Sequence, residues 1–359
     1  MGVYLFTGFP GFLAKQLVRE LAKKEKEAKI YLLVLPSQLE KANEELSLLQ
    51  YHHIQFEIIE GDITKEMLKI DSTNLERIYE EVEYVFHLAA IYDLAVKKDV
   101  AYRVNVIGTR NVIQFIKKIT HLKRLIYFST AYVAGLRKGT IYEYELDRNQ
   151  SFRNHYEETK FWAEVEVQRE MEQIPTTIIR PGIVIGDSLT GETAKFDGPY
   201  MILNFLQRLR YSPIIPYLHK ENVELNVVPV DYIVQATIFL AHTDETTSKV
   251  FHLTNPNPIG TKEAYALMAR QLLNKRPFGV FPLFLSKALL SFSFIRRWLM
   301  VEKEALDYFT CKSNYDCSEA VNYLRRSGIK CANFNSTVDT MVQYYKKHQY
   351  NKEKRILIK

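Results

Sequence analysis

The feature that most constrains this 359-residue chain is a regular alternation of two kinds of segment over its first half. Short runs rich in β-branched and aromatic residues alternate with longer charged segments in which apolar residues recur at helical spacing. This order is typical of parallel strands joined by helices, because parallel neighbours need a long crossover connection. The runs predicted as strands are Val3–Thr7, Ile30–Leu35, Ile54–Ile59, Tyr84–Leu88, Arg124–Ser129 and Thr176–Arg180.

The segment between the first two predicted strands indicates how the sheet is covered. Phe12, Leu13, Leu17 and Leu21 recur at helical spacing, with lysine and arginine residues between them. One face of such a helix packs on the sheet while the other meets water. We therefore predict an α/β fold with a doubly wound parallel sheet. The alternation ends after Arg180, where prolines separate mixed helical and strand-like pieces and no repeat is visible.

Composition and charge exclude several classes of protein. Hydrophobic residues at 47% and charged residues at 25% are globular values, so a disordered chain is excluded. The net charge of +6 is too small for a nucleic-acid-binding footprint. Because no signal segment precedes the first strand, we expect a cytoplasmic protein. The three cysteines, Cys311, Cys317 and Cys331, lack CxxC spacing and fit buried thiols in a reducing compartment. We expect no metal site, since His87 has no second ligand at metal spacing.

A glycine-containing turn, Thr7 to Ala14, follows the first predicted strand directly. Its glycines permit a tight turn and let the backbone approach a pyrophosphate at the N-terminus of the next helix. Ala14 stands where the common pattern has a third glycine, whose main role is close helix packing. A plain strand-to-helix turn is the alternative, since short motifs misfire often. The predicted cofactor contacts in this turn are Thr7, Gly8, Phe9, Gly11, Phe12 and Leu13.

Two further segments at strand ends strengthen the prediction of a Rossmann-type dinucleotide site. Gly61-Asp62-Ile63 follows the third strand, where Asp62 could reach the adenine, and His87-Leu88-Ala89-Ala90 follows the fourth, where small residues let a dinucleotide cross the sheet edge. Asp62 could instead be a helix N-cap and the alanines packing residues, but together their placement favours a ligand. The contacts predicted here are Asp62, Ile63, Leu88, Ala89 and Ala90. After the second strand, the run 35–38 carries neither an acid for a ribose hydroxyl nor a base for a 2′-phosphate, so the choice of dinucleotide stays open.

Tyr156 and Lys160 stand four residues apart, so on a helix their side chains lie on one face. A free phenol has a pKa of about 10, so acid/base work near neutrality needs a neighbouring ammonium to lower it. A tyrosine and a lysine four residues apart are common in sequences, so this spacing alone does not identify a site. The specific signal is their combination with Ser129-Thr130 at the end of the fifth strand, Asn105 on the preceding helix and the glycine turn.

With these residues the chain resembles the extended short-chain dehydrogenase/reductase family, from residue 3 to about residue 330. The resemblance implies that Thr130 is the active hydroxyl, with Ser129 as a second candidate, and that Tyr156 is the acid/base. Lys160 would also hold the nicotinamide ribose, and Asn105 would be the family's helix asparagine. It further implies that Pro181, Gly182 and Ile183 lie by the nicotinamide amide, a strained strand-exit turn being the alternative.

Further strings resemble the thioester-reductase and fatty acyl-CoA reductase branch of that family. They are residues 87–93, 128–135, 180–187, 190–192, 197–200, 226–232 and 251–255. The branch implies an NAD(P)H-dependent oxidoreductase that reduces an acyl thioester, or a fatty aldehyde, by hydride transfer. NADP is the preferred cofactor and NAD the alternative. Because the glycine motif begins at residue 7, we expect the thioester to arrive as an acyl-CoA or on a separate acyl-carrier protein.

Other functions stay open. One is an extended short-chain dehydrogenase acting on a secondary alcohol or ketone with the same four residues. A sugar-nucleotide epimerase or dehydratase is disfavoured, because such relatives usually carry an asparagine where Pro181-Gly182 follows the sixth strand. The third is a non-catalytic dinucleotide-binding sensor, against which the intact Thr130, Tyr156 and Lys160 speak. The residues leave acyl chain length, end product and oligomeric state undefined.

The domain prediction follows from these sites. We interpret residues 1–180 as a dinucleotide-binding Rossmann domain, 181–345 as a smaller mixed α/β substrate lobe interleaved with it, and 346–359 as a solvated basic tail. The most apolar stretch of the lobe is 278–300, but Pro282 and Lys287 interrupt it, and a spanning helix needs about 20 apolar residues. We favour core packing or a lid helix there; an apolar wall for an acyl chain or a peripheral membrane contact is the alternative.

Overall fold

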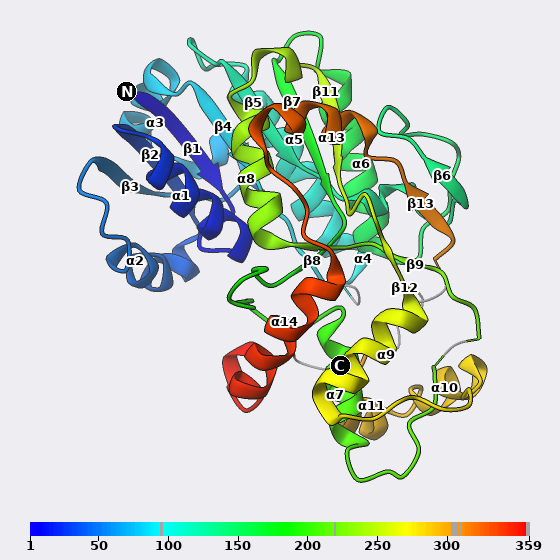
Figure 1. Cartoon of the computed structure of the whole chain (residues 1–359). Coiled ribbons are helices and arrows are strands. Elements are labelled where there is room, and N and C mark those ends of the chain that lie inside the picture. The colour runs from blue at the N-terminus through cyan, green and yellow to red at the C-terminus, as the bar shows by residue number, and fades with distance from the viewer. Residues whose placement is uncertain (94–95, 219, 303–307, 309–310, 357–359) are drawn as a thin grey trace.

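A seven-stranded sheet forms the centre of the computed structural model, which describes residues 1–93, 96–218, 220–302, 308 and 311–356 (Figure 1). The strand order is β11-β7-β5-β4-β1-β2-β3, and every neighbouring pair is parallel. The order reverses beside β1, which pairs with both β2 and β4, so the doubly wound α/β fold is confirmed. The strands are β1 (Gly2–Thr7), β2 (Ala28–Val34), β3 (Ile54–Glu60), β4 (Tyr84–His87), β5 (Arg124–Phe128), β7 (Thr176–Pro181) and β11 (Lys249–Leu253).

Helices cover both faces of this sheet because successive strand residues point to opposite sides. In β1, Phe6 belongs to one buried apolar cluster and Leu5 to the other. The Phe6 cluster receives α1 (Phe12–Lys24), α2 (Leu39–Ser47), α8 (Val230–Ala241) and α13 (Ser318–Leu324). The Leu5 cluster receives α3 (Ser72–Glu81), α5 (Gly108–Ile116) and α6 (His155–Arg169).

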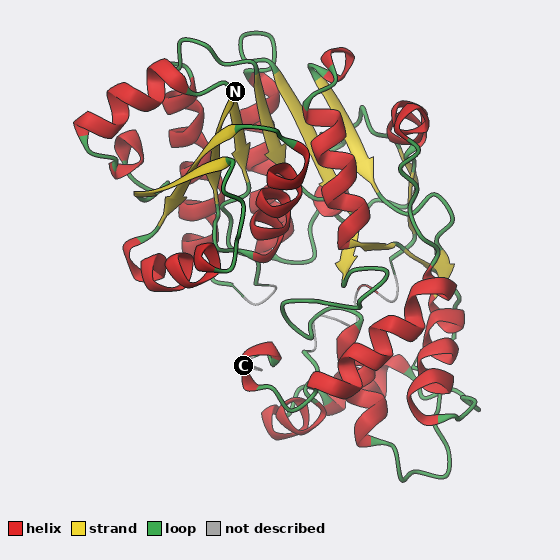
Figure 2. Ribbon diagram, turned by 60° about the vertical axis from the view of Figure 1, so that its left-hand side comes forward, coloured by secondary structure: helices red, strands yellow, loops and turns green. Residues whose placement is uncertain are grey.

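The second lobe is mainly helical and lies beyond the carboxyl ends of the strands (Figure 2). Its core joins α7 (Tyr200–Arg208), α9 (Thr261–Leu273) and α14 (Phe334–His348). Three small two-stranded sheets accompany the main sheet: β8 (Ile183–Ile185) with β10 (Val227–Pro229), β9 (Glu224–Leu225) with β12 (Ile259–Gly260), and β6 (Gly139–Ile141) with β13 (Ser313–Tyr315). The other short helices are α4 (Lys98–Ala101), α10 (Leu283–Leu289), α11 (Ser293–Leu299), the π-helical turn η3 (Tyr102–Ile107), and the single turns η1 (Pro36–Gln38), η2 (Glu66–Lys69), η4 (Ala131–Ala134), η5 (Asp244–Thr246), η6 (Arg325–Ser327) and η7 (Lys352–Lys354).

Three sequence expectations change at this level. The seventh strand, β11, comes from the second half of the chain, so the interleaving of the two predicted domains reaches into the main sheet. The predicted tail, residues 346–359, starts inside a helix, since α14 runs to His348, and the Lys354 carbonyl accepts a hydrogen bond from the Phe196 amide at 2.8 Å, while most residues of 346–356 are exposed. The core-packing interpretation of 278–300 fails for its aromatic side chains, since Phe278, Phe284 and others are exposed. Within the described residues, no helix combines the length and the apolar character that crossing a bilayer requires.

Candidate active site

The glycine turn between β1 and α1 lies beside the point where the strand order reverses. Gly8 has φ +89°, a backbone conformation that side-chain-bearing residues rarely adopt. A Cβ on Gly8 would lie 2.8 Å from the backbone nitrogen of Ala89, and one on Gly11 would lie 2.6 Å from the Gly8 carbonyl oxygen. The turn therefore requires glycine at both positions. Among the described residues no side chain caps the first turn of α1, so its backbone N–H groups suit an anionic ligand such as a pyrophosphate.

The apolar members of the predicted cofactor set lie in different surroundings. Phe9 is buried, whereas Phe12, Leu13 and Leu88 are partly buried and pack against the same core cluster. Ala90 is exposed at the sheet edge. Because the side chains of Phe9, Phe12 and Leu13 are engaged in packing, contact between these residues and a dinucleotide would come mainly from their backbone.

A chain of polar side chains fixes the floor of this site. The Thr7 hydroxyl lies 2.7 Å from His87 Nδ1 and accepts a hydrogen bond from the Ala89 amide at 3.1 Å. His87 Nε2 lies 3.1 Å from the Thr109 hydroxyl oxygen. Burial, with a smaller contribution from the Lys160 charge, lowers the pKa of His87 to about 3, so the imidazole is neutral. His87 thus links β1, β4 and α5.

Asp62 and Ile63 follow β3 at the same edge of the sheet. The Asp62 carboxylate accepts a hydrogen bond from the Thr64 amide at 2.8 Å, which closes a local turn. The Ile63 side chain occupies the space above Gly108, where a Cβ would lie only 2.7 Å from its Cδ1. The Asn111 amide group also donates to the Ile63 carbonyl at 2.8 Å. These contacts hold the β3 exit against α5.

Tyr156 and Lys160 lie one turn apart on α6, but Lys160 is directed at β5. Its Nζ donates to the Phe128 carbonyl oxygen at 2.6 Å and to the Tyr127 hydroxyl at 3.1 Å. Burial lowers the pKa of the Lys160 ammonium to about 8. The pKa of the Tyr156 phenol is raised, first by desolvation and then by the Glu157 charge. The expectation that Lys160 lowers the phenol's pKa is therefore wrong for this arrangement, because the ammonium is held by β5.

The two candidate hydroxyls at the end of β5 have different partners. Thr130 precedes η4, and its Oγ1 accepts a hydrogen bond from the Tyr132 amide at 3.3 Å. No acceptor among the described residues takes its own hydroxyl proton, so that proton is available to a ligand. The Ser129 hydroxyl donates to Glu164, whose carboxylate forms a fully buried ion pair with Arg180 at 2.5 Å. This geometry favours Thr130 over Ser129 as the substrate-facing hydroxyl.

Asn105 lies in the π-helical turn η3 and connects two parts of the site. Its Oδ1 accepts a hydrogen bond from the Ile91 amide at 2.9 Å, and its Nδ2 donates to the Thr159 hydroxyl at 3.0 Å. Single π-helical turns are frequent at functional sites. Asn105 therefore holds the β4 exit segment next to the helix that carries Tyr156.

Pro181, Gly182 and Ile183 lie where β7 passes into β8. The Gly182 amide donates to the Leu253 carbonyl at 3.1 Å and the Ile183 amide to the Asn226 carbonyl at 2.9 Å. A Cβ on Gly182 would lie 2.8 Å from that same Asn226 oxygen. This turn is tightly packed and lies at the carboxyl edge of the sheet.

Three residues beside the site, Tyr92, Glu164 and Arg180, were not among the predicted site residues. The Tyr92 ring packs edge-on against Tyr156, with 5.2 Å between ring centroids. Glu164 and Arg180 are 0% exposed, and the guanidinium also donates to the carbonyl oxygens of Glu143 and Glu145. A sequence signal existed for Glu164, because it follows Lys160 by one further helical turn and so belongs to the same face. Tyr92 offered no comparable spacing signal.

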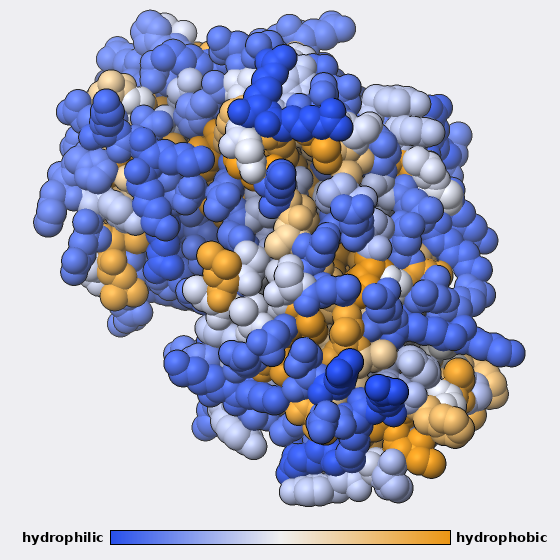
Figure 3. Space-filling view, in the orientation of Figure 1, coloured by the Kyte–Doolittle hydropathy of each residue, from blue (hydrophilic) through white to orange (hydrophobic). Residues whose placement is uncertain are grey.

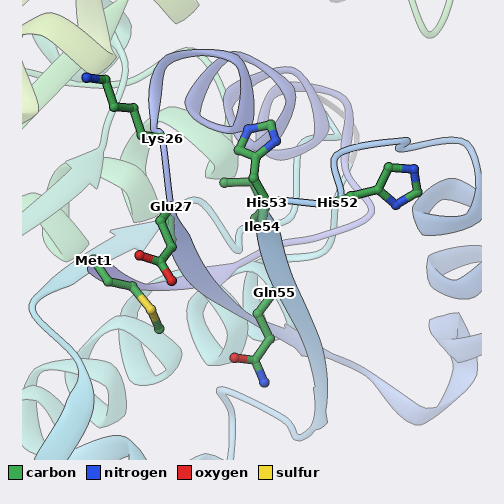
Figure 4. Close-up of a pocket in the computed structure, with 8 residues that line it drawn as sticks. Met1, Lys26, Glu27, His52, His53, Ile54 and Gln55 are labelled. Atoms are coloured by element: carbon green, nitrogen blue, oxygen red, sulfur yellow. The ribbon is translucent and has the colours of Figure 1, made fainter.

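A surface pocket at the opposite, amino end of the strands is separate from this site (Figure 4). The ring of His53 there lies 3.0 Å from the Ala22 carbonyl through Nε2, which is a structural contact. The pocket is lined by Met1, Lys26, Glu27, Ala28, His52, His53, Ile54 and Gln55.

Comparison with known proteins places this arrangement in a context. A family model described as Male sterility protein matches residues 6–237. "Fatty acyl-CoA reductase wat" of Drosophila melanogaster is 27% identical over 275 residues, covering 66% of this chain and 53% of that protein. "Alcohol-forming fatty acyl-CoA reductase" of Simmondsia chinensis is 30% identical over 160 residues, covering 39% of this chain and 32% of that protein. The match thus spans about half the length of the first relative and about a third of the second.

A similar fold is found in solved structures. The terminal R domain of the myxalamid PKS-NRPS biosynthetic pathway superposes with a TM-score of 0.80 at 24% identity, covering 98% of this chain and 92% of that one. This likeness extends the α/β fold over both the sheet and the lobe.

Proposed function

The chain belongs to the Male sterility protein family, and from that premise we propose that it is an NAD(P)H-dependent oxidoreductase that reduces an acyl thioester. Membership confirms the reductase branch that the sequence strings indicated. The observation that supports the proposal is the placement of Thr130 directly after β5 and of Tyr156 and Lys160 on α6, whose Lys160 donates to Phe128 of β5. The N-terminus of α1, which has no side-chain cap among the described residues, lies at the same edge of the sheet. A relative named as a fatty acyl-CoA reductase supports the choice of substrate class.

The residues present fit a dinucleotide. Gly8 and Gly11 keep side chains out of the turn, and the first turn of α1 offers N–H groups to the pyrophosphate. Asp62 and Ile63 would lie toward the adenine, Leu88, Ala89 and Ala90 under the centre, and Pro181 to Ile183 by the nicotinamide. When bound, the reduced cofactor supplies the hydride that attacks the thioester carbonyl carbon. NADP remains our preferred form of the cofactor, with NAD as the alternative.

The protein groups would act on the carbonyl oxygen. Thr130 donates a hydrogen bond to it as negative charge develops there. Tyr156, whose pKa is raised by burial, is protonated at neutral pH and would give its proton to the carbonyl oxygen as the hydride is transferred. The resulting hemithioacetal loses its thiol and leaves an aldehyde, and a second hydride addition to that aldehyde would give an alcohol. Lys160 would hold the ribose, and Asn105 would position α6.

The test is oxidation of NADPH or NADH by the purified chain with a panel of acyl-CoAs, acyl-carrier proteins and long-chain aldehydes. We expect turnover of at least one thioester and its loss in Tyr156→Phe. A complete lack of nicotinamide oxidation with every member of the panel would overturn the proposal. Turnover of secondary alcohols but of no thioester would identify a dehydrogenase instead.

A further inference from the structure

The helices α10 and α11 present a surface of large apolar side chains to solvent. Apolar residues gather at the lower right of Figure 3, where Figure 1 draws α10. Phe284 is 70% exposed and Trp298 53% exposed, and α11 buries none of its residues. Single exposed apolar residues are ordinary, but a contiguous group marks an interaction site. We call this group the aromatic surface; its members are Phe278, Phe284, Phe292, Phe294 and Trp298.

The chain segment around α10 and α11 contains basic but no acidic residues. Residues 264–301 contain six lysine and arginine residues and not one aspartate or glutamate. The chain has 48 basic and 42 acidic residues, so outside this segment the two kinds are balanced. Arg276 and Arg297 are exposed beside the aromatic surface. The chain segment that contains the aromatic surface therefore carries a formal charge of +6, equal to the net charge of the whole protein.

The aromatic surface is held in place by buried contacts on its inner side. Leu290 and Val301 form a small core with Met201 of α7. The Arg296 guanidinium donates to the carbonyl oxygens of Leu290 at 2.8 Å and Ser291 at 3.1 Å, which fixes the turn between α10 and α11. These contacts explain why the two helices stand against the lobe while their aromatic side chains point away from it.

We propose that α10 and α11 form a docking surface for a membrane with anionic headgroups. Aromatic side chains beside arginine and lysine are the composition that binds the interface of a bilayer, where rings enter the headgroup boundary and cations meet anionic lipid. A second copy of the chain would bring two equally basic surfaces together, which their charges oppose. The proposal is independent of the reaction proposed above, since it needs neither cofactor nor thioester.

The tryptophans offer a direct test, because the chain has two, Trp162 on α6 and Trp298 on α11. In Trp162→Phe, the emission of Trp298 is expected to shift to the blue when vesicles of phosphatidylcholine and phosphatidylglycerol in equal parts are added. Lipids carrying a quencher in the upper acyl chain should quench it. The matched control is Trp298→Phe, in which Trp162 remains and the same vesicles should cause no shift.

Co-sedimentation of the full chain with these vesicles measures the strength of docking. Arg297→Gln should weaken binding roughly fivefold, because each basic residue near an anionic surface contributes about that factor. The double change Phe284→Ser with Phe294→Ser should weaken it on the order of tenfold, since two rings are lost from the interface. The controls lie on the sheet half: Arg325→Gln and Leu48→Ser change exposed residues there and should leave binding unchanged.

Each outcome decides the proposal. Binding to mixed vesicles that exceeds binding to pure phosphatidylcholine, and that falls as salt is raised, supports it. It is overturned if Trp298 emission does not respond to mixed vesicles. It is also overturned if sedimentation equilibrium shows that the aromatic surface joins two copies, with Phe284→Ser and Phe294→Ser producing monomers. Binding of an acyl-carrier protein that these variants abolish, without vesicle binding, would assign the surface to that partner instead.

Discussion

Apolar residues are abundant both in the sheet and in the segment of α10 and α11, but they are buried in the sheet and largely exposed in α10 and α11. All seven residues of β2 are buried, whereas α11 buries none. The strand is enclosed because parallel strands are covered by helices on both faces. Helix α11, by contrast, packs against α7 on one side and leaves its other side exposed. Apolar content therefore indicates which segments can be buried. Whether a segment is buried depends on how many of its sides other elements cover.

The largest effect on activity should come from removing the proposed proton donor at the carboxyl edge of the sheet. Tyr156→Phe should lower kcat for thioester reduction on the order of 10²- to 10⁴-fold, the usual contribution of a positioned proton donor. The melting temperature and the affinity for the dinucleotide should stay close to the original, measured by thermal unfolding and fluorescence titration. An unchanged kcat would contradict the role given to this phenol.

Arg180 joins the sheet to its surroundings, so its loss should be the largest effect on stability. Arg180→Met leaves the Glu164 carboxylate buried without its ion-pair partner, and breaking such a pair costs about 3–5 kcal/mol. Urea unfolding would measure this as a lower free energy of unfolding. The double variant Arg180→Met with Glu164→Gln is the control, since it removes the stranded charge and should recover part of the loss. A single variant as stable as the original would show that the pair is dispensable.

Titration of the Lys160 ammonium should change activity and stability in opposite directions as the pH rises. Its pKa is lowered from 10.5 to about 8 in the fold, so between these values the unfolded chain binds more protons. The free energy of unfolding should therefore rise with pH across this window, while kcat/KM falls as the ammonium is lost. Both are measured from about pH 7 to about pH 9.5, below the range where tyrosines titrate. Lys160→Met should remove the rise in stability that belongs to this group; a rise of equal size in the variant would refute its origin.

The smallest effect should come from the aromatic surface. Phe278→Ser should change the free energy of unfolding by no more than about 0.5 kcal/mol, because the side chain is 76% exposed. The matched variant is Phe334→Ala in the core of the lobe, where the ring is 3% exposed and its loss should cost about 3–5 kcal/mol. Similar losses in both variants would show that Phe278 is buried in solution.

Much of the sheet was predictable because its signal is local. Each of the six predicted strands is a short apolar run between helical segments, and each is confirmed with ends within two residues. The seventh, Lys249–Leu253, was missed because it follows an irregular stretch and joins the sheet beside β7, far away in sequence. The combination of Thr130, Tyr156 and Asn105 came from the family resemblance, and the structure links Asn105 to α6 through Thr159.

Other properties of the site and the lobe depend on tertiary contacts, which residue spacing in the sequence does not indicate. The pKa of Tyr156 is raised, against the expectation, because burial desolvates the phenol and the Glu157 charge adds to the rise. Lys160 instead donates to Phe128 and Tyr127 of β5. The exposure of α10 and α11 depends on how few elements cover them. The polar network of Glu164 and Arg180 was left unpredicted because its partners are 16 residues apart and lie on different elements.

The link between Thr7, His87 and Thr109 also affects how a dinucleotide would be received. These side chains already hold one another across β1, β4 and α5, so their rotamers are ordered when the chain folds and not when a ligand arrives. These side chains are therefore already ordered before a dinucleotide binds, so that binding would not carry the entropic cost of ordering them. Amide hydrogen exchange at Ala89, whose N–H is bound by Thr7, should be slow with or without a dinucleotide.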